Sequence, residues 1–178
     1  MERNVKTLSK GSIWGVDLLM ILVTLGTQDK TFERLLKAVQ RQIDLGNIKD
    51  KVIVQAGNTK FITKDMEIYD LLPIDKFDKL IDEADVLITH AGVGSIVTGL
   101  KKNKKVIAAA RLKIYNEHEN DHQVQILNEL EKRGNIIALR EFDKLDEALE
   151  KAKNFVPNKF VSNTQNMVKL IEDYIENN

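Results

Sequence analysis

Four short apolar runs constrain this chain more than any other feature of its sequence. Residues 20–25 (MILVTL), 51–55 (KVIVQ), 85–89 (DVLIT) and 105–109 (KVIAA) are rich in β-branched and aliphatic side chains. Continuous apolar runs of this length are typical of strands that are buried on both faces, as in parallel sheets. Segments with apolar residues at helical spacing separate these runs, so the sequence predicts strands that alternate with helices.

The remaining elements follow from the same patterns. Further strands are predicted at 66–71 and 135–139, and helices at 32–43, 77–81, 95–100, 121–132, 142–152 and 164–175, with Gly134 ending the fourth. We therefore predict an α/β fold, a Rossmann-like parallel sheet with helices on both faces and right-handed connections. A single domain is expected over residues 20–178. Residues 1–19 are interpreted as a leader or an extended start with no assigned role.

Composition excludes several classes of function. The 27 Lys and Arg residues balance the 27 Asp and Glu residues, so general nucleic-acid binding is not expected. The chain has no cysteine, which excludes disulfides, thiolate catalysis and zinc–thiolate sites. No segment offers the ~18 apolar residues that a membrane-spanning helix needs. Residues 1–10 are basic, but no signal-peptide cleavage site of small residues follows them.

Three glycine-bearing turns follow predicted strands, at 26–28, 55–57 and 91–95. Ligands of open parallel sheets bind at the carboxyl ends of the strands, where these turns are expected. In the third turn, Gly92 and Gly94 allow backbone amides to approach an anion, and a helix is predicted to begin directly after them. Amides and the positive end of a helix favour a phosphate. A tight strand–helix turn without a ligand accounts for the glycines equally well.

The stretch 111–123 (RLKIYNEHENDHQ) is a polar segment between a strand and a helix. Glu117, Asp121 and Gln123 carry groups that form hydrogen bonds with sugar hydroxyls, as a polyol site requires. A solvated loop is the alternative interpretation, with Asp121 serving only as a helix N-cap.

The histidines also gather near this edge of the predicted sheet. A metal site from His118, His122 and Glu117 is conceivable. We predict none, because residues 116–120 have the composition of a loop. His90 follows a buried strand, where a histidine is more often structural, for instance by bonding the backbone of the glycine turn. It remains a weak candidate for a catalytic base.

Two familiar motifs are misleading or missing. Residues 82–85 spell the helicase box DEAD, but the phosphate-binding loop G-x-x-x-x-G-K-[ST] of that class is absent. No G-x-G-x-x-G follows the first predicted strand, which argues against a nicotinamide-dependent dehydrogenase.

Taken together, the motifs resemble the C-terminal domain of glycosyltransferase family 28, over residues 20–175. The resemblance rests on residues 89–96 (THAGVGSI), 105–107 (KVI), Arg111, 117–118 (EH) and 121–123 (DHQ), with the turns at 25–27 and 55–57 in matching positions. Short, stand-alone members of the family are the most similar. They include the catalytic subunit that adds the second N-acetylglucosamine to dolichol-linked precursors and small bacterial capsule and exopolysaccharide subunits.

The resemblance implies the donor-binding half of a GT-B glycosyltransferase, which is built from two Rossmann-like domains facing across a cleft. By position, Gly92, Gly94 and Ser95 would face the diphosphate of a UDP-sugar, and Gly26 and Thr27 would line the cleft. The residues expected near ribose, sugar and leaving diphosphate are Glu117, Asp121, His122, Gln123 and Arg111. The family usually has proline before this arginine, whereas this chain has Ala110.

Chain length predicts a two-component enzyme, because 178 residues hold one such domain and a GT-B enzyme needs two. The expected partner is a membrane-associated, acceptor-binding subunit that recruits this cytoplasmic chain to the inner face of the membrane. A homodimer is left open. The apolar stripe Met167, Val168, Ile171, Tyr174 and Ile175 is expected to pack on the chain's own sheet, with docking of the partner as the alternative.

The predicted activity is transfer of a hexose from a UDP-sugar to a lipid-linked acceptor, with inversion, in capsule or exopolysaccharide biosynthesis. No cofactor is expected besides the UDP-sugar substrate. No two aspartates lie two apart, so the Asp-x-Asp motif of metal-dependent glycosyltransferases is missing and metal independence is expected. Galactose or glucose is the expected sugar. The alternatives are a non-catalytic enhancer subunit of a partner glycosyltransferase and, less favoured, a nucleotide-sugar epimerase.

Overall fold

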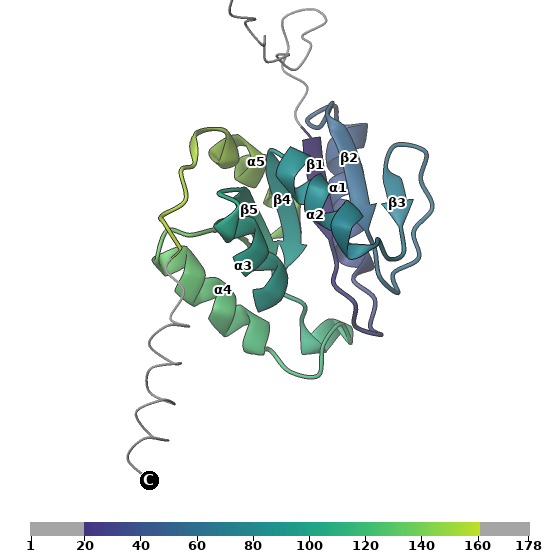
Figure 1. Cartoon of the computed structure of the whole chain (residues 1–178). Helices are drawn as coiled ribbons and strands as arrows, with labels where there is room; N and C mark the ends of the chain where they lie inside the picture. Colours follow the sequence, from purple (N-terminus) through teal and green to yellow (C-terminus); the bar gives the residue numbers. More distant parts are fainter. Residues whose placement is uncertain (1–19, 161–178) are drawn as a thin grey trace, which may run out of the picture.

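A computed structural model describes residues 20–160, in which six strands form one parallel sheet (Figure 1). The strands are β1 (Met20–Thr24), β2 (Lys51–Gln55), β3 (Glu67–Tyr69), β4 (Val86–His90), β5 (Lys105–Ala109) and β6 (Ile137–Leu139). Every neighbouring pair is parallel. The expected α/β, Rossmann-like fold is confirmed. The leader at 1–19 and the predicted helix at 164–175, with its apolar stripe, lie outside the described residues.

Residues 20–160 contain five α-helices, of which the first four connect strands and the last follows β6. They are α1 (Glu33–Asp44), α2 (Ile74–Glu83), α3 (Val93–Lys101), α4 (His122–Lys132) and α5 (Leu145–Asn154), with short 3-10 helices at Lys113–Tyr115 and Phe142–Lys144. Gly134 has a φ of 67° just beyond α4, which is the left-handed conformation of a helix-ending glycine, as expected. None of the helices described in residues 20–160 has the length and apolar character to cross a bilayer.

The order of the strands is β3-β2-β1-β4-β5-β6. From β1 the chain proceeds outward in one direction through β2 and β3, and then returns to the centre and proceeds in the other direction from β4. The carboxyl ends of β1 and β4 therefore flank a topological switch point, where loops diverge and leave a crevice. The first and third glycine turns follow these two strands.

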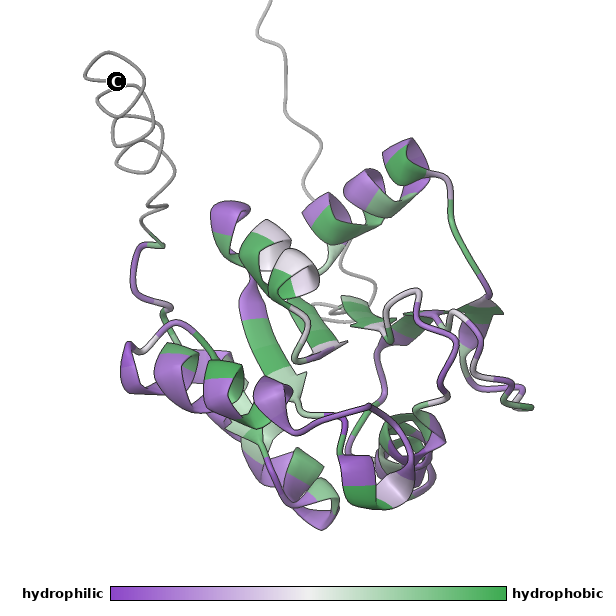
Figure 2. Cartoon of the chain, turned by 90° about the horizontal axis from the view of Figure 1, so that it is seen from below, coloured by the Kyte–Doolittle hydropathy of each residue, from purple (hydrophilic) through white to green (hydrophobic). Residues whose placement is uncertain are grey.

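Two apolar cores cover the faces of the sheet, because side chains of a strand alternate between its faces. Along β1, Ile21 and Val23 pack on one side with α1 and α5, whereas Leu22 packs on the other with α2, α3 and α4. Figure 1 shows α2 and α3 in front of the sheet, and Figure 2 shows hydrophobic sectors of the helices turned inward. The sheet is thus buried on both faces, as the apolar runs predict.

The boundaries differ from the predicted ones in places that matter. Strand β4 is shifted by one residue, so that His90 is its last residue and not the first residue of the turn. Helix α3 begins at Val93, between the two glycines, with Gly92 at its N-cap. Strands β3 and β6 have only three residues each, because they lie at the two ends of the sheet and have one neighbour.

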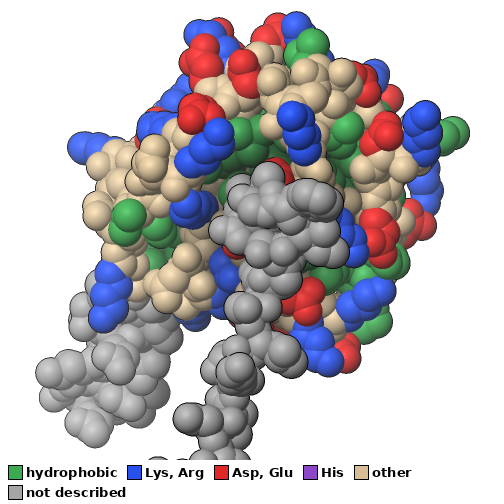
Figure 3. Space-filling view, turned by 90° about the horizontal axis from the view of Figure 1, so that it is seen from above, with side chains coloured by type: hydrophobic (Ala, Val, Ile, Leu, Met, Phe, Trp, Pro, Cys, Tyr) green, Lys and Arg blue, Asp and Glu red, His purple; other side chains and the backbone are tan. Residues whose placement is uncertain are grey.

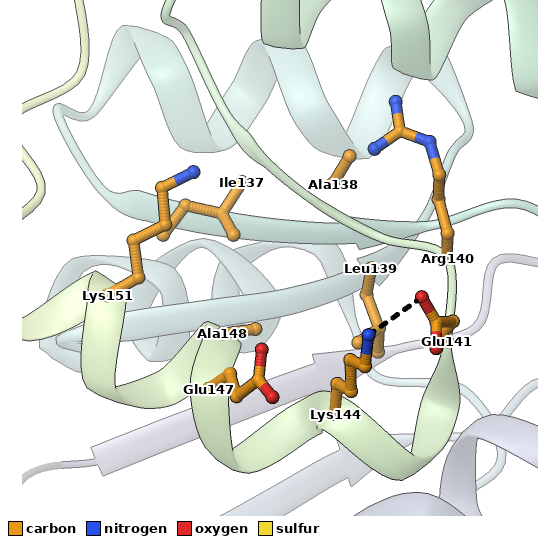
Figure 4. Close-up of a pocket in the computed structure, with 9 residues that line it drawn as sticks. All are labelled: Ile137, Ala138, Leu139, Arg140, Glu141, Lys144, Glu147, Ala148 and Lys151. Atoms are coloured by element: carbon orange, nitrogen blue, oxygen red, sulfur yellow. Dashed lines mark hydrogen bonds and ion pairs between the residues drawn. The ribbon is translucent and has the colours of Figure 1, made fainter.

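The open edge of β6 is covered by charged side chains. The amide of Ala138 donates to the carboxylate of Glu131 at 3.4 Å, and Arg140 holds the same carboxylate at 2.7 Å. A hollow lies between this strand and α5, where Lys144 pairs with Glu141 at 3.0 Å (Figure 4). On the face that Figure 3 shows, side chains of both signs are interspersed, in keeping with the formal net charge of zero.

Candidate functional site

A second hollow, of about 320 Å³, lies at the switch point of the sheet. It is lined by Thr24, Gly26, Thr27, Gln55, Phe77, His90, Gly92, Gly94, Ser95 and Thr98. The lining residues come from the ends of β1, β2 and β4, from the turns after β1 and β4, and from helices α2 and α3. The ten lining residues include no lysine, arginine, aspartate or glutamate, and His90 is their only titratable side chain.

The imidazole of His90 fits between two glycines at the wall of this hollow. A Cβ atom added to Gly26 would fall closer than 3.0 Å to ring atoms Cε1 and Nε2. A Cβ atom added to Gly92 would also fall closer than 3.0 Å to Nε2. Gly26 has a φ of 77°, which side chains other than hydrogen disfavour. The two glycines are therefore required by the histidine, whether or not a ligand binds.

The partners of His90 determine which of its nitrogens carries the proton. Nδ1 lies 3.4 Å from the carbonyl oxygen of Thr24 and 3.4 Å from Oγ1 of Thr89. The Thr89 hydroxyl donates its own hydrogen to the carbonyl of His90 at 3.1 Å, so that Oγ1 can only accept from the ring. Both partners of Nδ1 are acceptors, which assigns the proton to Nδ1 and a lone pair to Nε2.

Electrostatics keep this imidazole neutral. Burial lowers the pKa of His90 to about 4, and the charge of Arg111 contributes in the same direction. A weaker opposing effect comes from the bond to the Thr24 carbonyl, which favours the protonated ring. At neutral pH the side chain is thus an uncharged hydrogen-bond acceptor at Nε2.

The first turn of α3 supplies unpaired backbone donors next to His90. The first backbone bond within the helix is donated by Ile96 to the Gly92 carbonyl at 3.2 Å. The amides of residues 93–95 precede it and have no acceptor within the helix. A Cβ atom added to Gly94 would meet nothing within 4 Å, so open space lies beside this turn. Amides, helix dipole and space together make an anion site.

Two polar groups at the ends of β1 and β2 border the same hollow. Thr24 is 1% exposed, and its Oγ1 has no hydrogen-bond partner among the described residues. Gln55 accepts the amide of Leu72 through Oε1 at 3.1 Å. Because a buried hydroxyl is rarely left unpaired in native proteins, Thr24 is suited to a polar ligand in the hollow.

The polar loop 110–121 lies beside the third glycine turn, because β4 and β5 are neighbours. The amide of Ala91 donates to the carbonyl of Ala109 at 2.9 Å, which extends the β4–β5 pairing to this point. The two segments that the sequence singles out thus share one edge of the sheet. Their side chains are nevertheless employed differently.

Arg111 lies in the interior, with 1% of its surface exposed. Its guanidinium donates to the carbonyls of Leu25 and Lys30, the latter at 3.0 Å, and its Cζ atom lies 5.5 Å from the centre of the Phe32 ring. Arg111 thereby holds the loop after β1, and it does not line the hollow at the switch point. Contact with a diphosphate stays a prediction for this residue.

Glu117 and Gln123 are also buried and bonded within the protein. The carboxylate of Glu117 accepts two bonds from Arg34, at 2.9 and 2.7 Å, and one from the amide of Leu112 at 3.1 Å. Oε1 of Gln123 accepts the amide of Arg111 at 3.0 Å. These side chains fix the shape of the loop, and neither lines the hollow.

Asp121 and His122 are exposed at the start of α4. Asp121 stands at the N-cap position, but its carboxylate accepts the amide of Lys113 at 3.0 Å and does not cap the helix. His122 bonds Gln125 through Nδ1 at 2.9 Å. The structure therefore separates the predicted site residues into two sets: Gly26, Thr27, His90, Gly92, Gly94 and Ser95 line the hollow, whereas Arg111, Glu117, Asp121, His122 and Gln123 do not.

Thr24, Phe77 and Thr98 line the hollow without having been predicted, and Gln55 was indicated only as part of the turn at 55–57. Thr98 lies four residues after Gly94 and donates to its carbonyl at 2.8 Å, so helical spacing places both on one face. Thr24 and Gln55 are the last residues of adjacent strands, and ligands of open parallel sheets bind at the carboxyl ends of the strands. No signal in the sequence indicates Phe77. In residues 20–160 no three histidine, aspartate or glutamate side chains are placed to hold a metal.

A model of the glycosyltransferase family 28 C-terminal domain matches residues 20–176. The chain belongs to this family. Curated relatives include the UDP-N-acetylglucosamine transferase subunit ALG13 of Debaryomyces hansenii, 28% identical over 102 residues, which are 57% of this chain and 45% of that protein. The human protein of the same name is 28% identical over 129 residues, 65% of this chain and 10% of that protein. The chain thus spans less than half the length of these relatives.

Solved structures confirm the fold. An NMR structure of ALG13 has a TM-score of 0.54 and 19% identity, covering 85% of this chain and 94% of that chain. The calicheamicin glycosyltransferase CalG4 has a TM-score of 0.56 and 18% identity, covering 78% of this chain and 36% of that chain. A putative UDP-N-acetylglucosamine 2-epimerase from Listeria monocytogenes has a TM-score of 0.62 and 10% identity, covering 91% and 46%. At these identities the likeness concerns architecture alone.

Proposed function

We propose that this chain is the donor-binding subunit of a two-component inverting glycosyltransferase that transfers a sugar from a UDP-sugar to a lipid-linked acceptor. The observation that carries the proposal is the hollow at the β1–β4 switch point, where the free amides of α3 meet glycine turns in a family 28 domain. The diphosphate binds at these amides, whose dipoles stabilise the negative charge of the leaving UDP. The unpaired Thr24 hydroxyl supports a polar occupant.

In the proposed reaction, an acceptor hydroxyl attacks the anomeric carbon and the bond from this carbon to the β-phosphate oxygen breaks. The acceptor proton passes to a general base, and UDP leaves. A separate, membrane-associated subunit supplies the acceptor site and brings this chain to the membrane from the cytoplasm. No resident metal is assigned, because amides and the helix dipole meet the charge of the diphosphate. Chelation by EDTA should therefore leave the transfer rate unchanged.

The curated relatives are named as UDP-N-acetylglucosamine transferase subunits, which favours N-acetylglucosamine as the sugar. Galactose or glucose, and a role in capsule or exopolysaccharide biosynthesis, stay predictions from the sequence. Calorimetry on the full chain with UDP-N-acetylglucosamine, UDP-glucose and UDP-galactose separates these donors, with ADP-glucose as a control for the base.

The test of the site itself is Gly94→Asp. The new side chain enters open space, and an acidic residue in the first turn favours the helix, so the free chain should unfold at an unchanged or higher temperature. UDP-sugar binding should be lost, because the carboxylate occupies the place of the diphosphate. The matched control Gly94→Ala tests for steric effects of the first carbon. Undiminished binding by Gly94→Asp would exclude this hollow as the donor site.

A non-catalytic enhancer subunit is the alternative that this variant also addresses. If Gly94→Asp retains assembly with the partner while the complex loses transfer activity, the donor site of this chain is the one used in catalysis. If the complex with Gly94→Asp transfers sugar at the normal rate, the chain acts as an enhancer and the proposal is wrong.

A further inference from the structure

The hollow at the switch point provides one side chain that is able to acquire a positive charge, and this side chain is His90. The other nine lining residues are glycines, hydroxyl residues, one amide and one phenylalanine. Arg111, whose charge acts on His90, is directed to the carbonyls of Leu25 and Lys30. This inference rests on the proposed function, in which a diphosphate with two negative charges occupies the hollow.

In the free protein, the neutral imidazole of His90 directs a lone pair, and not a proton, toward the place of such an anion. Nδ1 holds its proton toward the Thr24 carbonyl and the Thr89 hydroxyl oxygen, and Nε2 carries a lone pair. Gly26 and Gly92 lie on the Nε2 side of the ring, where neither has a side chain that could shield it. A phosphate oxygen is an acceptor as well, so the two lone pairs repel until a proton lies between them.

We propose that binding of a UDP-sugar at this hollow is coupled to the uptake of one proton from solvent by Nε2 of His90. The imidazolium then donates through Nε2 to the diphosphate and keeps its Nδ1 bonds to β1 and β4. Release of UDP returns the proton to solvent. A protonated His90 has no lone pair for the acceptor hydroxyl, so in this proposal it binds the donor and is not the general base.

The charges around the ring decide the pH range of this coupling. Burial lowers the pKa of His90, and the charges of Arg111 and His118, both in the loop after β5, lower it further. The strands β1 and β4 contribute an uncharged carbonyl and hydroxyl, and helices α2 and α3 contribute Phe77, Gly94, Ser95 and Thr98. The free protein therefore has a neutral ring above about pH 5, and no aspartate or glutamate of residues 20–160 lines the hollow to favour its protonation.

Calorimetry at pH 7 tests the coupling. UDP-N-acetylglucosamine is the probe, because its diphosphate is esterified at both ends and does not titrate near neutrality, unlike UDP. In buffers with different ionisation enthalpies the observed heat should report uptake of about one proton, and the dissociation constant should rise about tenfold for each pH unit from 7 to 8. An uptake of zero at measurable affinity would overturn the coupling and leave the proposed function intact. Absence of binding by every UDP-sugar would overturn both.

Two variants make the readout specific. His90→Gln keeps a hydrogen-bond donor but cannot titrate, so proton uptake should vanish and the affinity should become independent of pH. Thr98→Val alters the same hollow without touching a titratable group, so its uptake should equal that of the parent chain. Loss of uptake in Thr98→Val, or its retention in His90→Gln, contradicts the assignment to His90.

A spectroscopic measurement avoids mutation altogether. Long-range nitrogen–proton NMR spectra distinguish a protonated ring nitrogen from one with a lone pair. In the free chain His90 should show the proton on Nδ1 alone, and addition of UDP-N-acetylglucosamine should protonate Nε2 as well. A ring that stays neutral in the complex would refute the proposal.

Discussion

The loops that follow β4 and β5 run side by side and use their residues in opposite ways. The turn at 91–95 has almost no functional side chains and leaves backbone amides open to a hollow. The loop at 110–121 is rich in charged groups, but the side chains of Arg111 and Glu117 form their hydrogen bonds with other residues of the protein. In this domain, backbone amides line the candidate ligand site, whereas the polar side chains of the neighbouring loop hold that loop in place.

Among substitutions that test this difference between the two loops, Arg111→Met should have the largest effect on stability. Removal of the guanidinium leaves the carbonyls of Leu25 and Lys30 without their donor. Hydrogen bonds to charged groups contribute about 1.5–3 kcal/mol each, so the loss of two should lower the free energy of unfolding by roughly 3–6 kcal/mol. Urea denaturation measures it. An unchanged stability with lost donor affinity would instead make Arg111 a ligand residue.

A slightly smaller effect should appear in the pH dependence of stability. The pKa of His90 is depressed to about 4 in the folded chain, below the usual value of 6.5. The stabilisation is therefore fully present above pH 6.5 and is lost as the pH falls toward 4. It amounts to roughly 3 kcal/mol, at 1.36 kcal/mol for each unit of pKa. Denaturation of the parent and of His90→Gln between pH 4 and 8 checks it, since the variant should lack this part of the slope.

A paired substitution sharpens the role of the glycines. In Gly92→Ala the new carbon would collide with the buried His90 ring, whereas in Gly94→Ala it would enter open space. Overpacking of this kind costs about 1–3 kcal/mol, so Gly92→Ala should unfold at a lower temperature. Gly94→Ala, within α3, should be neutral or stabilising, because alanine favours helices. Equal melting temperatures for the two variants would refute the steric account.

The smallest expected effect is the coupling between Arg34 and Glu117. Their two hydrogen bonds join α1 to the loop after β5, and Arg34 also lies 4.3 Å from the centre of the Tyr115 ring. Arg34 is partly exposed, so we expect a coupling energy of only about 1 kcal/mol from a double-mutant cycle of Arg34→Gln and Glu117→Gln. A coupling near zero would mean that Glu117 is free to serve a ligand.

The fold was predictable because its determinants are local. Short apolar runs predict β1, β2, β4 and β5, and Gly134 predicts the end of α4. Strand order is not local, and the reversal between β1 and β4 emerges only when the helices are packed on the two faces. The short strands β3 and β6 give a weak pattern, because an end strand has one neighbour.

The candidate site was predictable for its backbone and less so for its side chains. Gly92 is informative because a Cβ atom there would collide with the His90 ring, whereas Gly94 leaves open space beside the turn. A glutamate, by contrast, looks the same in a sequence whether it faces a sugar or an arginine 83 positions earlier, as Glu117 faces Arg34. Which predicted site residues line the hollow, and which bond within the protein, depends on contacts between residues far apart in the sequence. Those contacts are visible only in the folded chain.

The bond from the Ala138 amide to Glu131 has a consequence for solubility. An end strand normally offers free amides on which another chain can add a strand, the first step toward fibrous aggregates. Here a carboxylate, secured by Arg140, takes one of those amides and presents charge where an incoming backbone would have to lie. Within the described residues, this part of β6 is therefore unfavourable for the addition of a strand from a second copy of the domain.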